Sequence, residues 1–289
     1  MFKIKIYSLM LVALGVFLFI TNAQCLAECN ESGTYIICED WDSGTPPDPW
    51  PTENGDTWHG WEPAGYGGGD DGDIVSSPYH SSPRCLLLLK GDGHKSTVDI
   101  SHSISGSPTV VYVRFYLRIP SGETANAGSM AHVVFLNTAS QAEVALDLRK
   151  CGEYNGGYFD CSSALGGKRV LAVHTYNPEI WIANNQKPAG QRDYFIIDDH
   201  EGEWILVEWK VDFAGDKTSL WINETAHVID YSMPWANSSA GSIVLSGFTQ
   251  NTSGNIHYYF DDVVVSTSYI GPRSLGPSSP TGLRIIKIE

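Results

Sequence analysis

The chain has 289 residues, and its 33 acidic residues outnumber its 18 lysines and arginines, which gives a formal net charge of -15 at pH 7. Such an acidic protein is unsuited to binding nucleic acid or an anionic membrane surface, because both carry negative charge themselves. The length allows one large domain or two small ones.

The N-terminus has the pattern of a secretory signal peptide. Two lysines precede an apolar run at residues 9–20, and small residues suited to cleavage follow at Ala23 and Ala27. The run is short for a membrane span and lies at the start of the chain, which favours a cleaved signal over an anchor. We expect residues 1–27 to be removed and the mature protein to be secreted, to the extracellular space or the periplasm, without membrane insertion. The mature charge would then be -17, since the signal contains two lysines and no acid.

The rest of the chain is a series of short β-rich segments separated by Gly, Pro, Asn, Asp and Ser, which is typical of a sandwich or jelly roll. We predict twelve strands, at residues 34–41, 85–91, 96–101, 110–119, 132–138, 142–149, 169–176, 194–198, 204–213, 218–224, 242–250 and 257–268. Twelve strands make two sheets of about six. We therefore expect an all-β fold, a two-sheet antiparallel β-sandwich formed by one domain over residues 28–271. Residues 272–289 would be a C-terminal linker or tail.

Five cysteines follow the signal, and in an oxidising compartment such cysteines form disulfides. We expect Cys151 to pair with Cys161, and Cys29 with Cys38. Cys85 is flanked by leucines and is predicted to be buried and unpaired, although a bond between Cys38 and Cys85 is an open alternative. The spacings do not match a zinc site.

The stretch TVVYVRFYLRIP at residues 109–120 alternates strictly between apolar and polar side chains, so it has one core face and one face of arginines and tyrosines. Two further strands carry polar residues on one face. If these strands are neighbours in one sheet, they form a floor on which sugar rings stack and arginines bind carboxylates. The candidate ligand residues are Tyr112, Arg114, Tyr116, Arg118, Glu143, Asp147, Arg149, His174 and Tyr176. The alternative is a solvated face with ordinary cross-strand pairs, such as Arg114 with Glu143.

Acidic doublets lie within the first and last predicted strands, at Glu39 and Asp40 and at Asp261 and Asp262. Adjacent carboxylates repel one another and Asp is unfavourable in strands, so we expect a compensating partner. A structural Ca²⁺ bound by carboxylate and backbone oxygens would serve, and aspartates capping turns are the alternative.

Three motifs together resemble the concanavalin A-like lectin/glucanase superfamily, especially its polysaccharide lyase-like jelly rolls. They are EDWDSG at the end of the first strand, WILVEWKVDF followed by SLWINE, and the closing YFDDVVVSTSYIG. The resemblance covers residues 34–271. It implies a jelly roll with a concave sugar-binding sheet and a calcium on the convex side between the first and last strands. By this resemblance Asp261 is a calcium ligand, and Asp40 or Glu39 is its partner.

The glucanases of this superfamily carry three acids on one strand, whereas EVALDLR has only Glu143 and Asp147, so glycoside hydrolysis is disfavoured. A lyase needs a cation for the uronate carboxylate and a base for the C5 proton. The candidates are His174, Tyr176 and Arg149. His132 is a further possible group, but it shares its side of the strand with Val134 and Leu136, so a core-edge histidine is the alternative.

The motifs of the lyase families, such as RxEL, are absent. We therefore predict a lectin-like module that binds a polysaccharide or cell-surface glycan. A basic floor on an acidic protein favours an acidic glycan. The alternatives are a polysaccharide lyase acting by β-elimination on a uronate-containing glycan, and a structural domain without a ligand.

Overall fold

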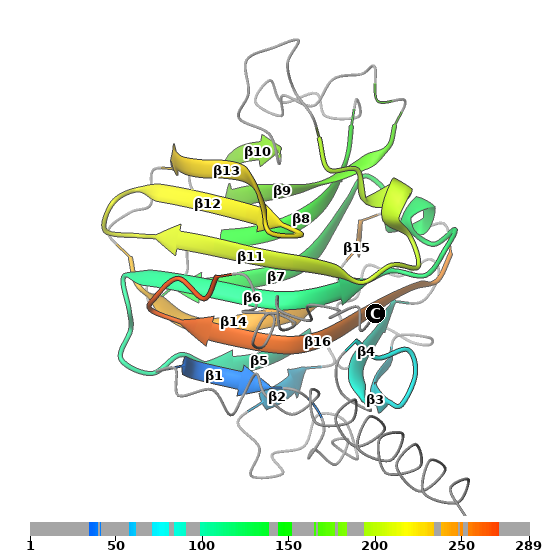
Figure 1. Cartoon of the computed structure of the whole chain (residues 1–289), viewed down its shortest axis with the longest axis horizontal. Helices are drawn as coiled ribbons and strands as arrows, with labels where there is room; N and C mark the ends of the chain where they lie inside the picture. The colour runs from blue at the N-terminus through cyan, green and yellow to red at the C-terminus, as the bar shows by residue number, and fades with distance from the viewer. Residues whose placement is uncertain are drawn as a thin grey trace, which may run out of the picture.

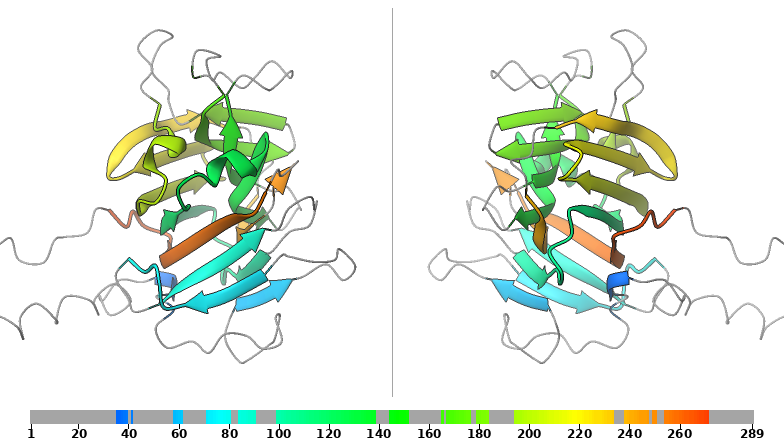
Figure 2. Two further views of the ribbon diagram at one scale, coloured as in Figure 1. Left: turned by 90° about the vertical axis from the view of Figure 1, so that its right-hand side faces the viewer. Right: turned by 90° about the vertical axis from the view of Figure 1, so that its left-hand side faces the viewer.

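A computed structural model describes residues 35–39, 41, 58–61, 71–80, 84–90, 99–138, 144–151, 165, 167–176, 179–183, 194–233, 238–247, 249–250 and 254–271. These residues form two antiparallel sheets that face each other (Figures 1 and 2). The predicted all-β sandwich is confirmed. Among the described residues, no helix is long and apolar enough to cross a membrane.

The first layer, sheet A, runs across the front of Figure 1. Its strand order is β13 (Thr225–Ser232), β12 (Lys217–Ile222), β11 (Ile205–Asp212), β6 (Val110–Arg118), β16 (Ile256–Ser266), β4 (Cys85–Lys90) and β3 (Asp71–Val75). The strand β1 (Tyr35–Glu39) also pairs with β16. The last long strand of the chain is thus central in sheet A and pairs with the first one.

The second layer, sheet B, lies behind sheet A in Figure 1. Its order is β10 (Glu179–Ala183), β9 (Arg169–Tyr176), β8 (Val144–Lys150), β7 (Met130–Thr138), β14 (Ala240–Ser246), β5 (Asp99–Ser103) and β2 (Trp58–Trp61). The short β15 (Thr249–Gln250) adds to β7.

The strict alternation of β6 explains the layering. Val111, Val113, Phe115 and Leu117 are fully buried members of the core between the sheets. The intervening side chains therefore lie on the outer face of sheet A, the face turned away from sheet B. The same pattern in β8 buries Val144, Leu146 and Leu148 in the core and turns Asp147 and Arg149 to the outer face of sheet B.

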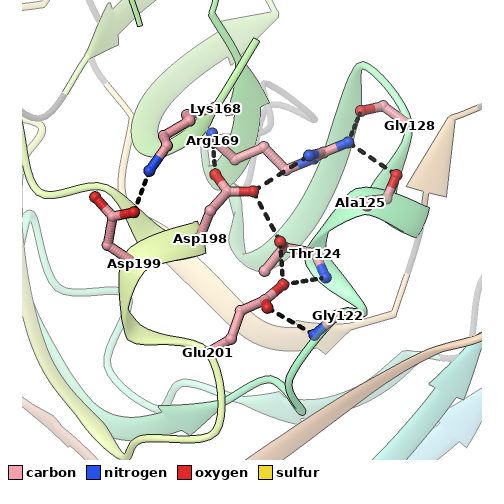
Figure 3. A network of polar contacts seen from close by, with 9 residues as sticks. All are labelled: Gly122, Thr124, Ala125, Gly128, Lys168, Arg169, Asp198, Asp199 and Glu201. Carbon is pink, nitrogen blue, oxygen red and sulfur yellow. Dashed lines mark hydrogen bonds and ion pairs between the residues drawn. The ribbon is translucent and has the colours of Figure 1, made fainter. Parts of the chain in front are cut away.

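A polar network joins two short 3-10 helices, η1 (Thr124–Ala127) and η3 (Ile197–His200), to the start of β9 (Figure 3). The Arg169 guanidinium donates to Asp198 and to the carbonyls of Ala125 and Gly128 at 3.3, 2.9 and 3.2 Å. Thr124 donates to Asp198 at 2.8 Å. The Glu201 carboxylate accepts the backbone N–H groups of Gly122 and Thr124, so the network fixes the loop that leads into β7.

Two expectations need correction. Residues 194–198 form no strand: one bridge joins Ile196 to Val170, and η3 begins directly afterwards. Cys85 is a free, buried thiol as predicted, so the alternative bond to Cys38 is wrong. The disulfides of Cys38 with Cys29 and of Cys151 with Cys161 stay predictions, because Cys29 and Cys161 lie outside the described residues.

Candidate functional site

The predicted floor is divided between the two sheets. Tyr112, Arg114, Tyr116 and Arg118 lie on β6, whose neighbours are β11 and β16 in sheet A. The strands β8 and β9, which carry Asp147, Arg149, His174 and Tyr176, pair with each other in sheet B. The expectation that these strands share one sheet is therefore wrong. Strand pairing depends on long-range contacts that a local alternation pattern does not contain.

On the outer face of sheet A, the arginines and tyrosines of β6 contact other parts of the chain. Arg114 lies opposite Glu208 of β11, and its Nη1 donates to the carbonyl of Gly271 at 3.0 Å. Arg118 Nε donates to the carbonyl of Gly202 at 2.8 Å. Arg114 thus has Glu208 as its cross-strand neighbour, and not Glu143.

The ring of Tyr116 lies under His80, with the ring centroids 3.5 Å apart and nearly parallel. The edge of Trp204 also approaches His80. As a result, only 8% of Tyr116 is exposed. The role of these β6 side chains as ligand residues stays a prediction, and their internal contacts weigh against it.

The acidic doublet of β16 lies in a β-bulge near the place where β16 changes partner from β4 to β1. Asp262 has a left-handed backbone, with φ of 49°. Asp261 accepts the backbone N–H of His80 at 2.8 Å and that of Asp262 at 2.9 Å. Glu39 accepts the backbone N–H of Trp41.

These contacts do not assemble a set of ligands for the predicted calcium ion. Within the described part of the chain, no three His, Cys, Asp or Glu side chains lie close enough together to hold a metal ion. Asp40 lies outside the described residues. Calcium binding by Glu39, Asp40 and Asp261 therefore stays a prediction.

A cluster of ionisable side chains lies on the outer face of sheet B, where it joins three adjacent strands. A β-bulge between His132 and Val134 of β7 changes the side of the strand to which His132 points. His132 thus pairs with Asp147 of β8 and faces outward with it, while Val133 and Val134 are both fully buried. The alternative of a core-edge histidine is therefore wrong.

The carboxylate of Asp147 lies between two imidazoles. His132 Nδ1 is 2.6 Å from Asp147 Oδ1, and His174 Nδ1 is 3.3 Å from Asp147 Oδ2. The Asp147 and His174 side chains are almost completely buried, whereas 12% of the His132 side chain is exposed. Since an ionised carboxylate only accepts hydrogen bonds, Nδ1 of His132 is the donor, and in the neutral ring the lone pair is on Nε2.

Burial alone would raise the pKa of Asp147, but the charge and hydrogen bond of His132, followed by those of His174, outweigh burial and lower it. For His174 burial is the largest influence and lowers the pKa, and Asp147 offsets it only in part. Asp147 is thus held ionised and His174 is favoured as the neutral imidazole. Perturbed groups gathered in one place are characteristic of functional sites, although structural networks produce them as well.

Arg149 belongs to the same face, two residues from Asp147 on β8. It is paired across the sheet with Met130 and Val170 and is 5% exposed. Sheet B therefore combines a cation, a buried carboxylate and two histidines, which is the set of groups that proton transfer next to a carboxylate requires. Glu143 and the side chain of Tyr176 lie outside the described residues, so their predicted roles are untested.

No family model and no curated protein matches the sequence. Solved structures do match the fold: "Cellulose induced protein, Cip1" has a TM-score of 0.56 at 13% identity, over 82% of this chain and 99% of that one. The endo-beta-1,4-glucuronan lyase from the fungus Trichoderma reesei has a TM-score of 0.42 at 12% identity, over 73% of this chain and 94% of that one. At such identities the likeness concerns the fold alone. The fold is a two-sheet jelly-roll sandwich, as the resemblance to the concanavalin A-like superfamily predicts.

Proposed function

We propose that this protein is an exported, lectin-like module that binds an acidic polysaccharide on the outer face of sheet B. The observation that carries the proposal is the convergence of Arg149, Asp147, His132 and His174 from three adjacent strands. Arg149 provides a fixed cation for a uronate carboxylate, and His132, the more exposed of the two histidines, provides a ring nitrogen for a hydroxyl group.

The test measures binding of a panel of polyuronates and glycosaminoglycans to the mature protein by calorimetry. Arg149→Ala should weaken binding by about tenfold or more, because a charge-assisted bond to a carboxylate contributes about 1.5–3 kcal/mol. Arg114→Ala is the matched control, since Arg114 is equally buried, at 5% exposure, but lies on sheet A. Loss of binding in Arg114→Ala with none in Arg149→Ala would contradict the proposal and favour the floor on β6.

A second candidate is β-elimination at the same site, and the Asp147–His132 hydrogen bond favours it. Asp147 holds His132 Nδ1 as a donor, so Nε2 can accept the C5 proton of a uronate. The electron pair of the C5–H bond then forms the C4–C5 double bond as the C4–O4 bond breaks, and the leaving oxygen takes up a proton. Arg149 would stabilise the charge that develops on the carboxylate.

Product formation separates the two candidates, because the unsaturated uronate absorbs in the ultraviolet and binding alone gives no such signal. If the protein is a lyase, His132→Gln should abolish the absorbance change while the binding that depends on Arg149 remains. Asp147→Asn should reduce the rate and change its pH profile, since Asp147 acts through His132. Binding without any product would eliminate the lyase.

A further inference from the structure

A small pocket lies on the outer face of sheet A, the face opposite the proposed glycan site. It is formed by β11, by β12 and the turn that follows it, and by the segment after β16. The lining residues are Leu206, Glu208, Trp221, Glu224, Tyr269 and Gly271. The proposed function does not use this pocket.

Two buried side chains hold one wall of the pocket in place. Glu208 Oε1 accepts the backbone N–H groups of Ile270 and Gly271 at 2.9 and 3.3 Å. Arg114 donates to the Gly271 carbonyl at 3.0 Å. These bonds fix the segment 269–271 across β6 and β11, and they thereby fix the position of Tyr269.

Aromatic rings form much of the lining. The ring of Tyr269 is 5.3 Å from that of Trp221 and tilted by 45° against it, and its other neighbour is Tyr112 at 6.0 Å. Tyr269 is half exposed, so its ring is accessible from solvent. The faces of Trp and Tyr rings carry partial negative charge and attract cations within about 6 Å.

Two glutamates line the pocket, but burial raises the pKa of Glu208, so the exposed Glu224 is the main source of negative charge. Glu208 lies at the base, where Arg114 is its cross-strand neighbour. Glu224 is exposed in the tight turn between β12 and β13, where its φ is 64°. Within the described part of the chain, Glu224 forms no ion pair or hydrogen bond. Its charge therefore remains available to a ligand.

We propose that this pocket binds a primary ammonium group on a slim alkyl chain, as in a lysine side chain. The cavity volume is about 10 Å³, which suits one group of the size of a water molecule. An ammonium group has that size, and its three N–H donors can reach Glu224 while the alkyl stem lies against Trp221. A quaternary ammonium group or a pyranose is too bulky, and the exposed carboxylate of Glu224 repels an acidic sugar.

The test titrates the full chain with n-butylamine and with Nα-acetyl-lysine N-methylamide, by ligand-detected NMR at low ionic strength. We expect weak, salt-sensitive binding of both probes. Equal affinities would show that the pocket recognises only the ammonium group and its alkyl stem. Tighter binding of the lysine derivative would show that the ammonium group belongs to a lysine of a peptide. Both results support the proposal.

The double variant Tyr269→Ala/Glu224→Gln should weaken binding by about tenfold, since it removes both the cation–π contact and the ion pair. The matched control is Tyr231→Ala/Glu203→Gln, which removes a tyrosine and a glutamate of similar exposure outside the pocket. The control should bind as the wild type does. Unchanged affinity in the double variant would overturn the proposal, as would equal or tighter binding of tetramethylammonium, glucosamine or methyl glucoside.

Discussion

Replacement of Arg169 by methionine tests the role of the polar network in Figure 3. The Arg169 side chain is 7% exposed and that of its partner Asp198 is 19% exposed. The variant keeps an apolar stem but removes the donor to Asp198 and to the carbonyls of Ala125 and Gly128. A carboxylate then stays in a largely buried place without its cation.

Breaking a buried pair by removing one partner costs about 3–5 kcal/mol. We expect about 3 kcal/mol here, the lower end of that range, because Asp198 keeps some contact with water. In a domain of this size each kcal/mol lowers Tm by about 2–4 °C, so Arg169→Met should lower Tm by about 6–12 °C. Thermal and urea unfolding followed by circular dichroism would measure both quantities.

The adjacent residue provides the control. Lys168 pairs with Asp199 in the same network, but both side chains are about half exposed, at 45% and 49%. An exposed pair contributes little, so Lys168→Met should leave Tm unchanged. If Arg169→Met lowers the free energy of unfolding by less than about 1 kcal/mol, or by no more than Lys168→Met does, the buried ion pair of the network does not stabilise the fold.

Two further predictions concern titration and reactivity. The lowered pKa of His174 means that the unfolded chain binds a proton first as the pH falls below about 6.5, so the free energy of unfolding should decrease from there until the folded pKa is reached. His174→Gln should flatten this decrease, and an unaltered stability profile would contradict the prediction. The lowered pKa of Asp147 acts in a separate pH range, because the stability that the ionised Asp147 contributes is lost as the pH falls below about 3.9. Burial, followed by the charge of Asp261, raises the pKa of Cys85 to about 12. Iodoacetamide at mildly alkaline pH should therefore alkylate Cys85 only after unfolding, and rapid labelling of the native protein, detected by peptide mass spectrometry, would show that the thiol is accessible.

The sequence predicts the fold well where alternation is strong. In β6 the apolar set from Val111 to Leu117 is the buried set, since period-two patterning depends only on local geometry. The strands β2, β3, β10 and β13 were not predicted. Two of these strands lack a clear alternation of apolar and polar residues, because they gain little from burial. The strand β3 contains a glycine and two aspartates, in DGDIV, and the residues of β13 are mainly exposed.

The candidate site was predicted only in part, for two physical reasons. Sheet membership depends on which distant strands pair, and nothing in the β6 pattern shows that its neighbours are β11 and β16. The bulge in β7 changes the side to which His132 points, so strict alternation along the strand wrongly places that residue on the core face. The consecutive apolar residues Val133 and Val134 after a histidine were the available signal, since an interruption of alternation within a strand indicates a bulge.

The most direct test of the central claim observes the histidine rings by NMR while an oligouronate is added. His132 and His174 lie on the outer face of sheet B, whereas His80 and His257 lie against the outer face of sheet A and serve as internal controls. Glutamine variants of each histidine assign the signals. We predict that the ring signals of His132 and His174 shift with saturation while those of His80 and His257 stay in place. Shifts confined to His80 and His257 would contradict the assignment of sheet B as the glycan-binding face.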